Sequence, residues 1–328
     1  MTNLHVLVVG GAGYIGSHMV KHLAKTGCKV TTLDNLASGH RDAVLHGEFV
    51  LGDLADRPLL RELFDTTRFD AVMHFASFIQ VGESVQKPAM YYENNVTNTL
   101  NLLDTMRLSG VDKFIFSSTA ATFGEPQYSP IDEKHPQHPI NPYGRSKLFV
   151  ERILEDYEHA YGLRSVCLRY FNAAGADPEG QLGERHEPET HLIPLILQAA
   201  SGRRPAISVF GRDYDTPDGT CIRDYVHISD LCTAHWLALL SLMNGVGSQR
   251  YNLGNGQGFS VQEVIDSALR ITGSDIKVVD ALRRVGDPAR LVADATLATQ
   301  QLGWHPRFSD LDIMLAHAWQ WEQRMVSR

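Results

Sequence analysis

The first half of the chain alternates short apolar runs with longer stretches in which apolar residues recur every three or four positions. The short runs predict β-strands and the periodic stretches predict helices. Six runs have strand length: 4–9, 29–33, 48–51, 69–74, 113–116 and 164–170. Helical periodicity is clearest over 88–108 and 143–161. Because strands that alternate with helices form parallel sheets, the pattern predicts an α/β fold with a doubly wound sheet of five or six parallel strands.

The pattern is less regular after residue 172. Apolar periodicity predicts helices over 191–200, 230–243, 261–272, 295–302 and 311–324. Short apolar runs predict strands over 207–210 and 251–253. We therefore expect a sheet domain over 1–172, to which part of 225–255 returns. A smaller C-terminal lobe is expected over 173–328, closing over the sheet edge to bind the substrate.

A glycine-rich turn, 10–16, directly follows the first predicted strand and precedes a predicted helix. Gly10 allows a sharp turn, Gly13 lets a pyrophosphate approach the backbone, and Gly16 lets the helix pack close to the strand. The helix N-terminus offers N–H groups and a positive dipole end to phosphates. This strand–turn–helix context predicts a Rossmann-type dinucleotide site.

Two acidic residues follow predicted strands. Asp34 ends the second strand, where a carboxylate accepts hydrogen bonds from an adenosine ribose and disfavours a 2′-phosphate. We therefore expect NAD rather than NADP. Asp53 follows the third strand and has two interpretations: it binds the adenine, or it caps the helix that begins near Arg57.

Composition narrows the function classes. With 328 residues, the chain is long enough for two lobes. The net charge of −8, without a lysine–arginine run, argues against a nucleic-acid partner. The four cysteines include no CxxC pair, and no apolar stretch approaches membrane length. The first strand runs into glycines rather than a signal-cleavage site, so we expect a cytoplasmic protein with no membrane partner.

Tyr143 and Lys147 lie four residues apart at the start of a predicted helix, and hence on one helix face. A nearby ammonium favours the phenolate and lowers the pKa of a tyrosine, which makes it a usable base near neutral pH. The lysine is also expected to hold a nicotinamide ribose. Ser118 and Thr119 end the fifth strand, where a hydroxyl can meet a substrate hydroxyl. The set suits proton removal from an alcohol whose carbon gives a hydride to NAD.

Further segments with specific sequences extend through most of the chain. They are 10–18, 33–36, 81–85, 91–96, 141–147, 168–175 and 218–227. In them the chain resembles the extended short-chain dehydrogenases/reductases, and closely the UDP-glucose 4-epimerase family. The resemblance implies reversible epimerisation at C4 of UDP-glucose and UDP-galactose, through transient hydride transfer to tightly bound NAD and a 4-keto intermediate. It also implies a homodimer in which the helices over 88–108 and 143–161 pair across a two-fold axis.

Roles for individual residues follow from the same resemblance. Tyr143 is implied as the base at the sugar O4, with Lys147, Thr119 and Ser118 assisting it. The implied cofactor contacts are Gly10, Gly13, Tyr14, Ile15, Gly16, Asp34, Asn35, Asp53, Leu54, Phe75, Ala76, Asn94, Ser117, Tyr143, Lys147 and Tyr170. The implied substrate contacts are Thr119, Tyr143, Asn172, His191, Leu192, Phe210, Arg223, Arg284 and Asp287.

Elementary chemistry supports part of the substrate set. Arginines suit a diphosphate because a guanidinium makes bidentate hydrogen bonds, and an aromatic face suits a planar base such as uracil. The alternative for Arg223 and Arg284 is a salt bridge between the lobes, and the alternative for Phe210 is a plain core position; the ligand roles are favoured.

Other functions share parts of this site. A nucleotide-sugar 4,6-dehydratase needs an acid and a base just after the strand-five threonine, where this chain has Ala120 and Ala121. A UDP-glucuronate decarboxylase fits the later segments less well, and a reductase would use the same catalytic residues. A regulator that only senses NAD would be expected to have lost Tyr143 or Lys147.

The segment 186–191 resembles a metal-binding motif. His186 and His191 flank an acidic stretch, as in a zinc-binding helix, but they lie five residues apart rather than four. Pro188 would also break such a helix. The sequence therefore predicts no metal site.

Three positions depart from the family pattern. Ile79 stands where some members carry a lysine near the cofactor, and Thr190-His191 stands where some carry paired asparagines. Leu291 stands where some carry a tyrosine that narrows the sugar pocket.

The smaller side chain of Leu291 leads to a prediction about specificity. We expect measurable 4-epimerisation of UDP-N-acetylglucosamine, because a pocket without the tyrosine leaves room for a 2-acetamido group. Turnover on this substrate and on UDP-glucose should be compared with the same enzyme preparation. No detectable reaction with the N-acetylated sugar would contradict the prediction.

Overall fold

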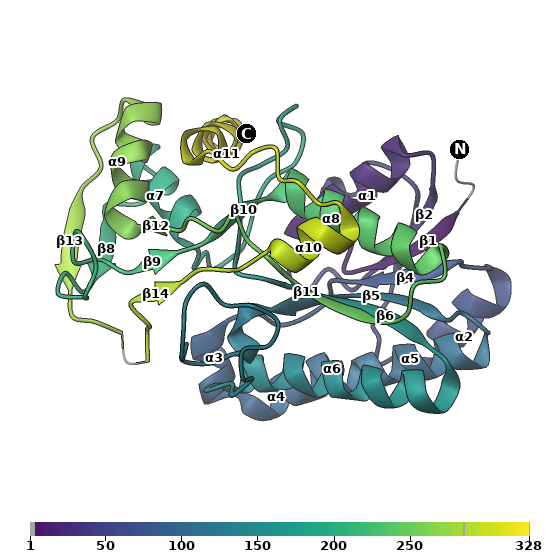
Figure 1. The fold of residues 1–328 in the computed structure, drawn as a ribbon. Helices are drawn as coiled ribbons and strands as arrows, with labels where there is room; N and C mark the ends of the chain where they lie inside the picture. The colour runs from purple at the N-terminus through teal and green to yellow at the C-terminus, as the bar shows by residue number, and fades with distance from the viewer. Residues whose placement is uncertain (1–3, 285, 328) are drawn as a thin grey trace.

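The computed structural model describes residues 4–284 and 286–327, which form a large lobe around a parallel sheet and a smaller lobe beside it (Figure 1). The sheet has seven strands in the order β11-β6-β5-β4-β1-β2-β3. Their bounds are His5–Val9 (β1), Lys29–Asp34 (β2), Glu48–Leu51 (β3), Ala71–His74 (β4), Lys113–Thr119 (β5), Arg164–Tyr170 (β6) and Gln249–Leu253 (β11). The predicted doubly wound α/β fold of the Rossmann type is thus confirmed, with one strand more than the five or six expected from the first half.

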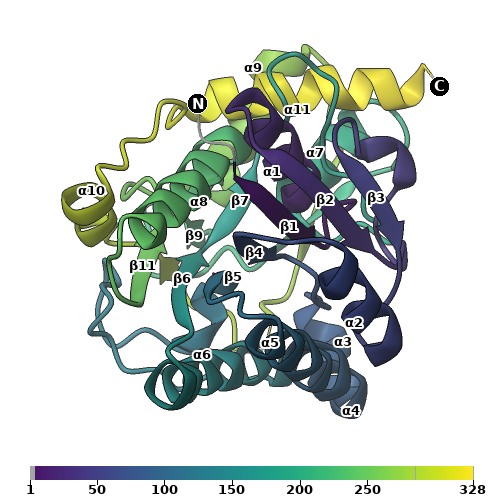
Figure 2. The same ribbon diagram turned by 90° about the vertical axis from the view of Figure 1, so that its right-hand side faces the viewer.

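Side chains alternate between the two faces of the sheet, as the pleat requires. In β1, Val6 and Val8 belong to one apolar core, while Leu7 and Val9 belong to the other. Helices α1 (Tyr14–Lys25), α8 (Ile228–Met243) and α10 (Thr296–Leu302) cover the first face. Helices α2 (Arg57–Thr66), α5 (Asn98–Leu108) and α6 (Pro142–Tyr161) cover the second (Figure 2). Since both faces are covered, the central strands β1, β4, β5 and β6 are buried almost throughout.

The long helix expected over 88–108 is divided. Helix α4 (Pro88–Tyr92) runs into a π-helical turn (Glu93–Thr97), and α5 continues from Asn98. The expected helix over 88–108 is therefore confirmed, with one π-helical turn inside it that was not expected. Within this turn, Asn95 bonds across to the chain after β4: its amide oxygen accepts a hydrogen bond from the Phe78 N–H at 2.9 Å. Helix α3 (Val81–Gln86) precedes this segment.

The smaller lobe is built from three helices, α7 (Leu192–Ala200), α9 (Val261–Thr272) and α11 (Leu311–Val326), around a third apolar core. Its strands are short and pair in three small sheets. They are β7 (Asn172–Ala174), β8 (Ile207–Phe210), β9 (Ile222–Arg223), β10 (Tyr225–His227), β12 (Phe259–Ser260), β13 (Val278–Ala281) and β14 (Arg290–Leu291). Except for β8, these strands were not expected from the sequence, because two to four residues carry too little periodicity to be recognised.

No helix in the described ranges 4–284 and 286–327 has both the length and the apolar character needed to cross a membrane.

Candidate active site

The order of the strands creates the crevice in which the site is built. The chain runs from β1 outwards through β2 and β3, then returns to β4 on the other side of β1. In such sheets ligands bind outside the carboxyl ends of the strands, at the point where the direction reverses. The glycine-rich turn follows β1, and Phe75-Ala76 follows β4, so both predicted cofactor segments flank this point.

Two glycines of the turn are required because neighbouring backbone atoms leave no room for a side chain. Gly10 has a φ of +79°, and a Cβ there would lie 2.4 Å from the nitrogen of Ala76. A Cβ on Gly16 would lie 2.1 Å from the carbonyl oxygen of Gly10. Gly13 differs, because its Cβ would meet only the Gly10 oxygen, at 3.5 Å. The backbone at Gly13 thus leaves open space at the N-terminus of α1, where a pyrophosphate fits.

Asp34 ends β2 beside this turn. Its Oδ2 accepts a hydrogen bond from the N–H of Ala12 at 2.9 Å, and its Oδ1 accepts one from Leu36 at 2.8 Å. These bonds hold the carboxylate at the sheet edge, next to the glycine turn. The turn, the helix N-terminus and the carboxylate together fit a dinucleotide such as NAD.

Asp53 does not cap α2. That role belongs to Asp56, whose Oδ1 accepts from the N–H of Leu59 at 3.1 Å. Asp53 instead accepts a 2.6 Å hydrogen bond from the side-chain amide of Asn35. The interpretation of Asp53 as a helix cap is therefore wrong. The two predicted cofactor contacts Asn35 and Asp53 lie side by side.

Lys147 lies at the centre of the catalytic set. Its Nζ donates to Ser77 Oγ at 2.6 Å and to the carbonyl oxygen of Ser117 at 2.8 Å, and it lies 4.8 Å from the ring centre of Phe116. The residue is 2% exposed. Burial lowers the pKa of Lys147 to about 7, although the charge of Glu151 opposes the shift. The lysine is thus poised between its charged and neutral forms at neutral pH.

Tyr143 begins the same helix, which Asn141 caps by accepting from the N–H of Gly144 at 2.8 Å. Burial raises the pKa of Tyr143, and a side-chain hydrogen bond with Thr119 lowers it by less. The expected lowering of this pKa is therefore wrong for the structure. The physical reason is that the desolvation of a phenolate in this position outweighs the help of the Thr119 hydrogen bond.

The two hydroxyls at the end of β5 have different partners. Thr119 reaches Tyr143, whereas Ser118 donates to Glu151 Oε1 at 2.5 Å. Glu151 makes a bidentate ion pair with Arg169, with N–O distances of 2.5 and 3.0 Å, and both side chains are almost fully buried. Arg169 accordingly holds the pKa of Glu151 below its usual value against the effect of burial.

The remaining predicted cofactor residues line the same sheet edge or support it. Ser117 and Tyr170, at neighbouring strand ends, share a hydrogen bond between their hydroxyls. The hydroxyl of Tyr14 donates to the carbonyl oxygen of Gly175 at 2.7 Å, which links α1 to the loop after β7. The other four lie in different places. Ile15 packs partly buried on the core of the α1 face, and Leu54 is buried in the core of the opposite face. Phe75 lies against His235, and Asn94 donates to Asn95.

Four predicted substrate residues gather in the small lobe and its border. Arg223 pairs with Asp287 inside this lobe, so it is not a bridge between lobes. The guanidinium of Arg284 lies 3.9 Å from the ring centre of Phe210, which is only partly buried. The Phe210 ring is thus not closed in the apolar core, and one of its faces is covered by Arg284.

Asn172 lies where the lobes join, donating from its side-chain amide to the Asp224 carbonyl oxygen at 2.8 Å. Leu291 pairs in register with Arg223 across β14 and β9, which brings the proposed specificity position next to a predicted substrate residue. Ile79 is exposed between β4 and α3.

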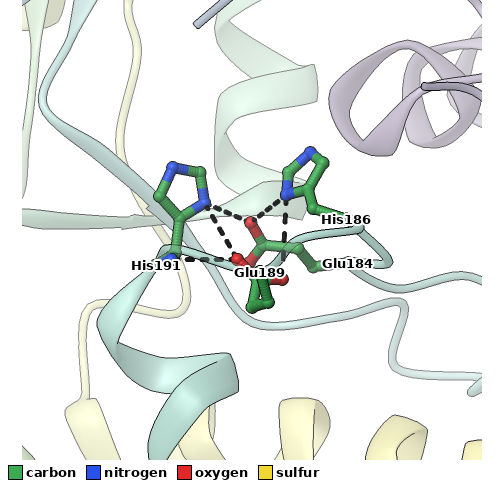
Figure 3. Close-up of side chains that lie close together, drawn as sticks. All are labelled: Glu184, His186, Glu189 and His191. Atoms are coloured by element: carbon green, nitrogen blue, oxygen red, sulfur yellow. Dashed lines mark hydrogen bonds and ion pairs between the residues drawn. The ribbon is translucent and has the colours of Figure 1, made fainter. Parts of the chain in front are cut away.

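His191 and Leu192 begin α7, and the imidazole of His191 forms an ion pair with Glu184. Burial alone would lower the pKa of His186, but the hydrogen bonds that it donates to Glu184 and Glu189 raise it to about 10. The same carboxylates raise the pKa of His191 against burial. The paired histidines thus form one cluster with two acidic residues (Figure 3).

Sequence reasoning missed several supporting residues. Ser77 was recognised only as the end of the β4 segment, yet it accepts from Lys147. Asn95 also holds the catalytic helix, donating to Ser146 Oγ at 3.0 Å. Ser77 could have been identified from its position at a strand end, whereas Asn95 depends on a π-helical turn that no periodicity reveals.

A doubly wound sheet with a dinucleotide crevice and a Tyr–Lys pair defines an NAD-dependent enzyme of the short-chain dehydrogenase/reductase class. The chain belongs to the NAD dependent epimerase/dehydratase family, whose model matches residues 6–254, and within it to the UDP-glucose 4-epimerases.

The similarity covers almost the whole chain. A UDP-glucose 4-epimerase of Halalkalibacterium halodurans is 51% identical over 97% of this chain and 95% of its own. The structure of the UDP-glucose 4-epimerase from Brucella ovis in complex with NAD is 52% identical, with a TM-score of 0.95 and coverage of 96% and 97% of the two chains. The UDP-Glc/GlcNAc 4-epimerase of Campylobacter jejuni is 44% identical, with a TM-score of 0.86 and coverage of 98% and 100%.

The glycine turn yields a prediction that separates packing from binding. Gly16→Ala should lower the free energy of unfolding of the NAD-stripped protein by about 1–3 kcal/mol, since its Cβ overlaps backbone. Gly13→Ala should cost under about 1 kcal/mol, the range of a changed helix cap, but should abolish retention of NAD. Urea unfolding and NAD content after purification measure the two effects. Equal destabilisation by both variants would contradict the assignment.

The buried lysine yields a prediction about pH. Folded Lys147, with its pKa near 7, releases its proton between about pH 7 and 9, whereas an unfolded lysine, ordinarily near 10.5, keeps it. Because the unfolded state then binds more protons, this group makes stability rise with pH. The free energy of unfolding of the NAD-stripped wild type, minus that of Lys147→Met, should therefore increase over this range. Urea unfolding at each pH measures it. Lys29→Met, at an exposed lysine of β2, controls for the general loss of a charge. If the difference between the wild type and Lys147→Met does not change with pH, the lowered pKa of Lys147 is refuted.

Proposed function

We propose that the chain interconverts UDP-glucose and UDP-galactose by epimerisation at C4, with NAD bound throughout the cycle. The observation that carries the proposal is the buried Tyr143–Lys147–Thr119 set beside the dinucleotide crevice. The relatives that match over the full chain length favour this reaction over the dehydratase and decarboxylase alternatives. Ala120 and Ala121, which form a short 3₁₀ turn after β5, supply no acid or base for a dehydration.

NAD, when bound, accepts the hydride of C4 and returns it to the opposite face of the 4-keto sugar. The chain's own residues prepare this exchange. The N-terminus of α1 and the backbone at Gly13 hold the pyrophosphate, and Asp34 accepts hydrogen bonds from the adenosine ribose. The remaining predicted cofactor residues line the crevice.

Tyr143 takes the proton from the sugar O4 and later gives it back. Thr119, hydrogen-bonded to Tyr143, orients the phenol and the incoming hydroxyl. Lys147 stabilises the phenolate when it is charged, and its pKa near 7 keeps the charged form accessible at neutral pH. Because only the phenolate can take this proton, the raised pKa of Tyr143 has to be offset by the charged form of Lys147.

The small lobe holds the UDP and leaves the sugar free to turn. Arg223 and Arg284 bind the diphosphate, and the ring of Phe210 stacks on the uracil. Asp287, now paired with Arg223, exchanges this partner for a ribose hydroxyl when the diphosphate arrives. Asn172 and Leu192 complete the wall at the border of the lobes. The chain therefore divides into an NAD-binding part, 1–172 with part of 225–255, and a UDP-sugar-binding part, 173–328.

A second substrate class is favoured by one observation. Leu291 lies beside Arg223 in β14 and is smaller than a tyrosine. The 44% identical neighbour is named a UDP-Glc/GlcNAc 4-epimerase, which supports acceptance of N-acetylated sugars here as well.

We also propose a homodimer in the cytoplasm. The outer surface of α5 and α6 carries exposed apolar residues, Leu108, Phe149 and Tyr161, which suit a helix-to-helix interface. Light scattering of the purified protein tests the dimer, and Phe149→Glu should give monomers. The four buried free cysteines suit a reducing compartment, and cell fractionation tests this location.

A coupled assay tests the main proposal. Purified protein is given UDP-galactose with no added NAD, and formation of UDP-glucose is followed. Product without added NAD is expected, since the cofactor remains bound through the cycle. No product even with added NAD would refute the proposed reaction.

Tyr143→Phe should lower kcat about 10²–10⁴-fold, because the phenyl ring cannot accept the O4 proton. Binding of UDP, measured by calorimetry, and retained NAD should stay as in the wild type. Tyr161→Phe, at an exposed tyrosine of the same helix, is the matched control and should keep full activity. Unchanged turnover in Tyr143→Phe would remove this residue from the mechanism.

A further inference from the structure

The loop between β7 and α7 brings four metal-binding side chains together: Glu184, His186, Glu189 and His191 (Figure 3). One ligand atom from each lies within 4.8 Å of all the others. His186 Nδ1 is 3.1 Å from Glu184 Oε1 and 3.7 Å from Glu189 Oε2. His191 Nδ1 pairs with the same oxygen of Glu184 and lies 4.0 Å from Glu189 Oε1.

These separations are close to those of a filled zinc site. Bonds of about 2.0–2.1 Å in tetrahedral geometry place neighbouring ligand atoms about 3.4 Å apart. Two imidazoles and two carboxylates are ligands that zinc accepts. Changes of about 1 Å in side-chain position would close the set around one ion.

The charge of the cluster also calls for a cation. The side chains of Glu184 and Glu189 are only 6% and 4% exposed. Among the described residues, the ion pairs of these two carboxylates are all with His186 and His191. Two buried carboxylates need compensating positive charge. His186 and His191 are their partners in this structure, and a bound divalent ion would supply the charge in their place. His191 is 46% exposed and gives the ion a path from solvent.

The backbone holds the ligands in place. Glu189 Oε1 accepts from the N–H groups of Thr190 and His191, at 2.7 and 2.9 Å, which leaves Oε2 directed at His186. Trp321 of α11 donates from its indole to the carbonyl oxygen of Glu184 at 3.0 Å. The loop is thus fixed before any ion binds.

We propose that Glu184, His186, Glu189 and His191 bind one divalent transition-metal ion, with zinc the best fit. Four protein ligands make the site closed and structural rather than catalytic. Pro188 excludes a zinc-binding helix, as expected, but the irregular loop brings the same histidines together in another way. The ion fastens the loop to the start of α7, beside Tyr14, whose ring lies 6.5 Å from that of His186. His191 then serves the metal rather than the UDP.

The test uses tag-free, full-length protein purified without chelators. Elemental analysis should find one zinc per chain, and calorimetric titration of the chelator-stripped protein with zinc sulfate should restore that ratio. Co²⁺ added to the stripped protein should give the intense visible absorption of a tetrahedral site. No zinc uptake in the titration, or a cobalt spectrum of six-coordinate solvated ion, would overturn the proposal.

Variants locate the site. His186→Gln and Glu189→Gln should each weaken zinc binding by more than the roughly 10- to 100-fold that changes outside the ligand set cost. His46→Gln, at an exposed histidine elsewhere, should bind zinc like the wild type. Circular dichroism and NAD content check that each variant is folded. Wild-type affinity in both ligand variants would refute the assignment, and the outcome is independent of the proposed epimerase activity.

Discussion

The site depends on a single buried ammonium. Lys147 lies on α6 and reaches across to the ends of two strands, donating to Ser77 after β4 and to the Ser117 carbonyl in β5. These two bonds fix how far the catalytic helix stands from the sheet edge, and therefore where the Tyr143 hydroxyl lies. A lysine is costly to bury, and its low pKa reflects that cost. The same group is thus both a structural tie and a source of charge that can be switched near neutral pH.

A second buried pair keeps this tie in position. One turn after Lys147, Glu151 binds Arg169 in β6 and accepts from Ser118 in β5. Buried ion pairs add little to stability when compared with apolar residues of the same size, but they penalise alternative registers because each partner would be left unpaired. The helix therefore meets the two strands in one register only, and the predicted catalytic side chains arrive at one edge together.

The sequence predicted the large lobe well and the small lobe poorly. Buried parallel strands and long helices carry strong periodicity, so the strands and the turn after β1 lie where expected. The π-helical turn at Asn95 and the two-residue strands β9, β12 and β14 depend on contacts between distant segments, which no local pattern records. The pKa of Tyr143 was mispredicted for a related reason: sequence spacing reveals a neighbouring lysine but not how deeply both groups are buried. The cluster around Glu184 was not expected, because the spacing of His186 and His191 was compared with a helix and the chain forms an irregular loop there.

Strand β11 has a consequence for biosynthesis. It completes the sheet beside β6, yet the chain reaches it only after entering the small lobe and returning. While the protein is being synthesised, the edge of β6 keeps open N–H and C=O groups until residue 253 has emerged. Such an edge pairs readily with other chains, so a nascent chain that pauses before this point is exposed to aggregation. The two lobes divide the ligands between them, but they mature as one folding unit.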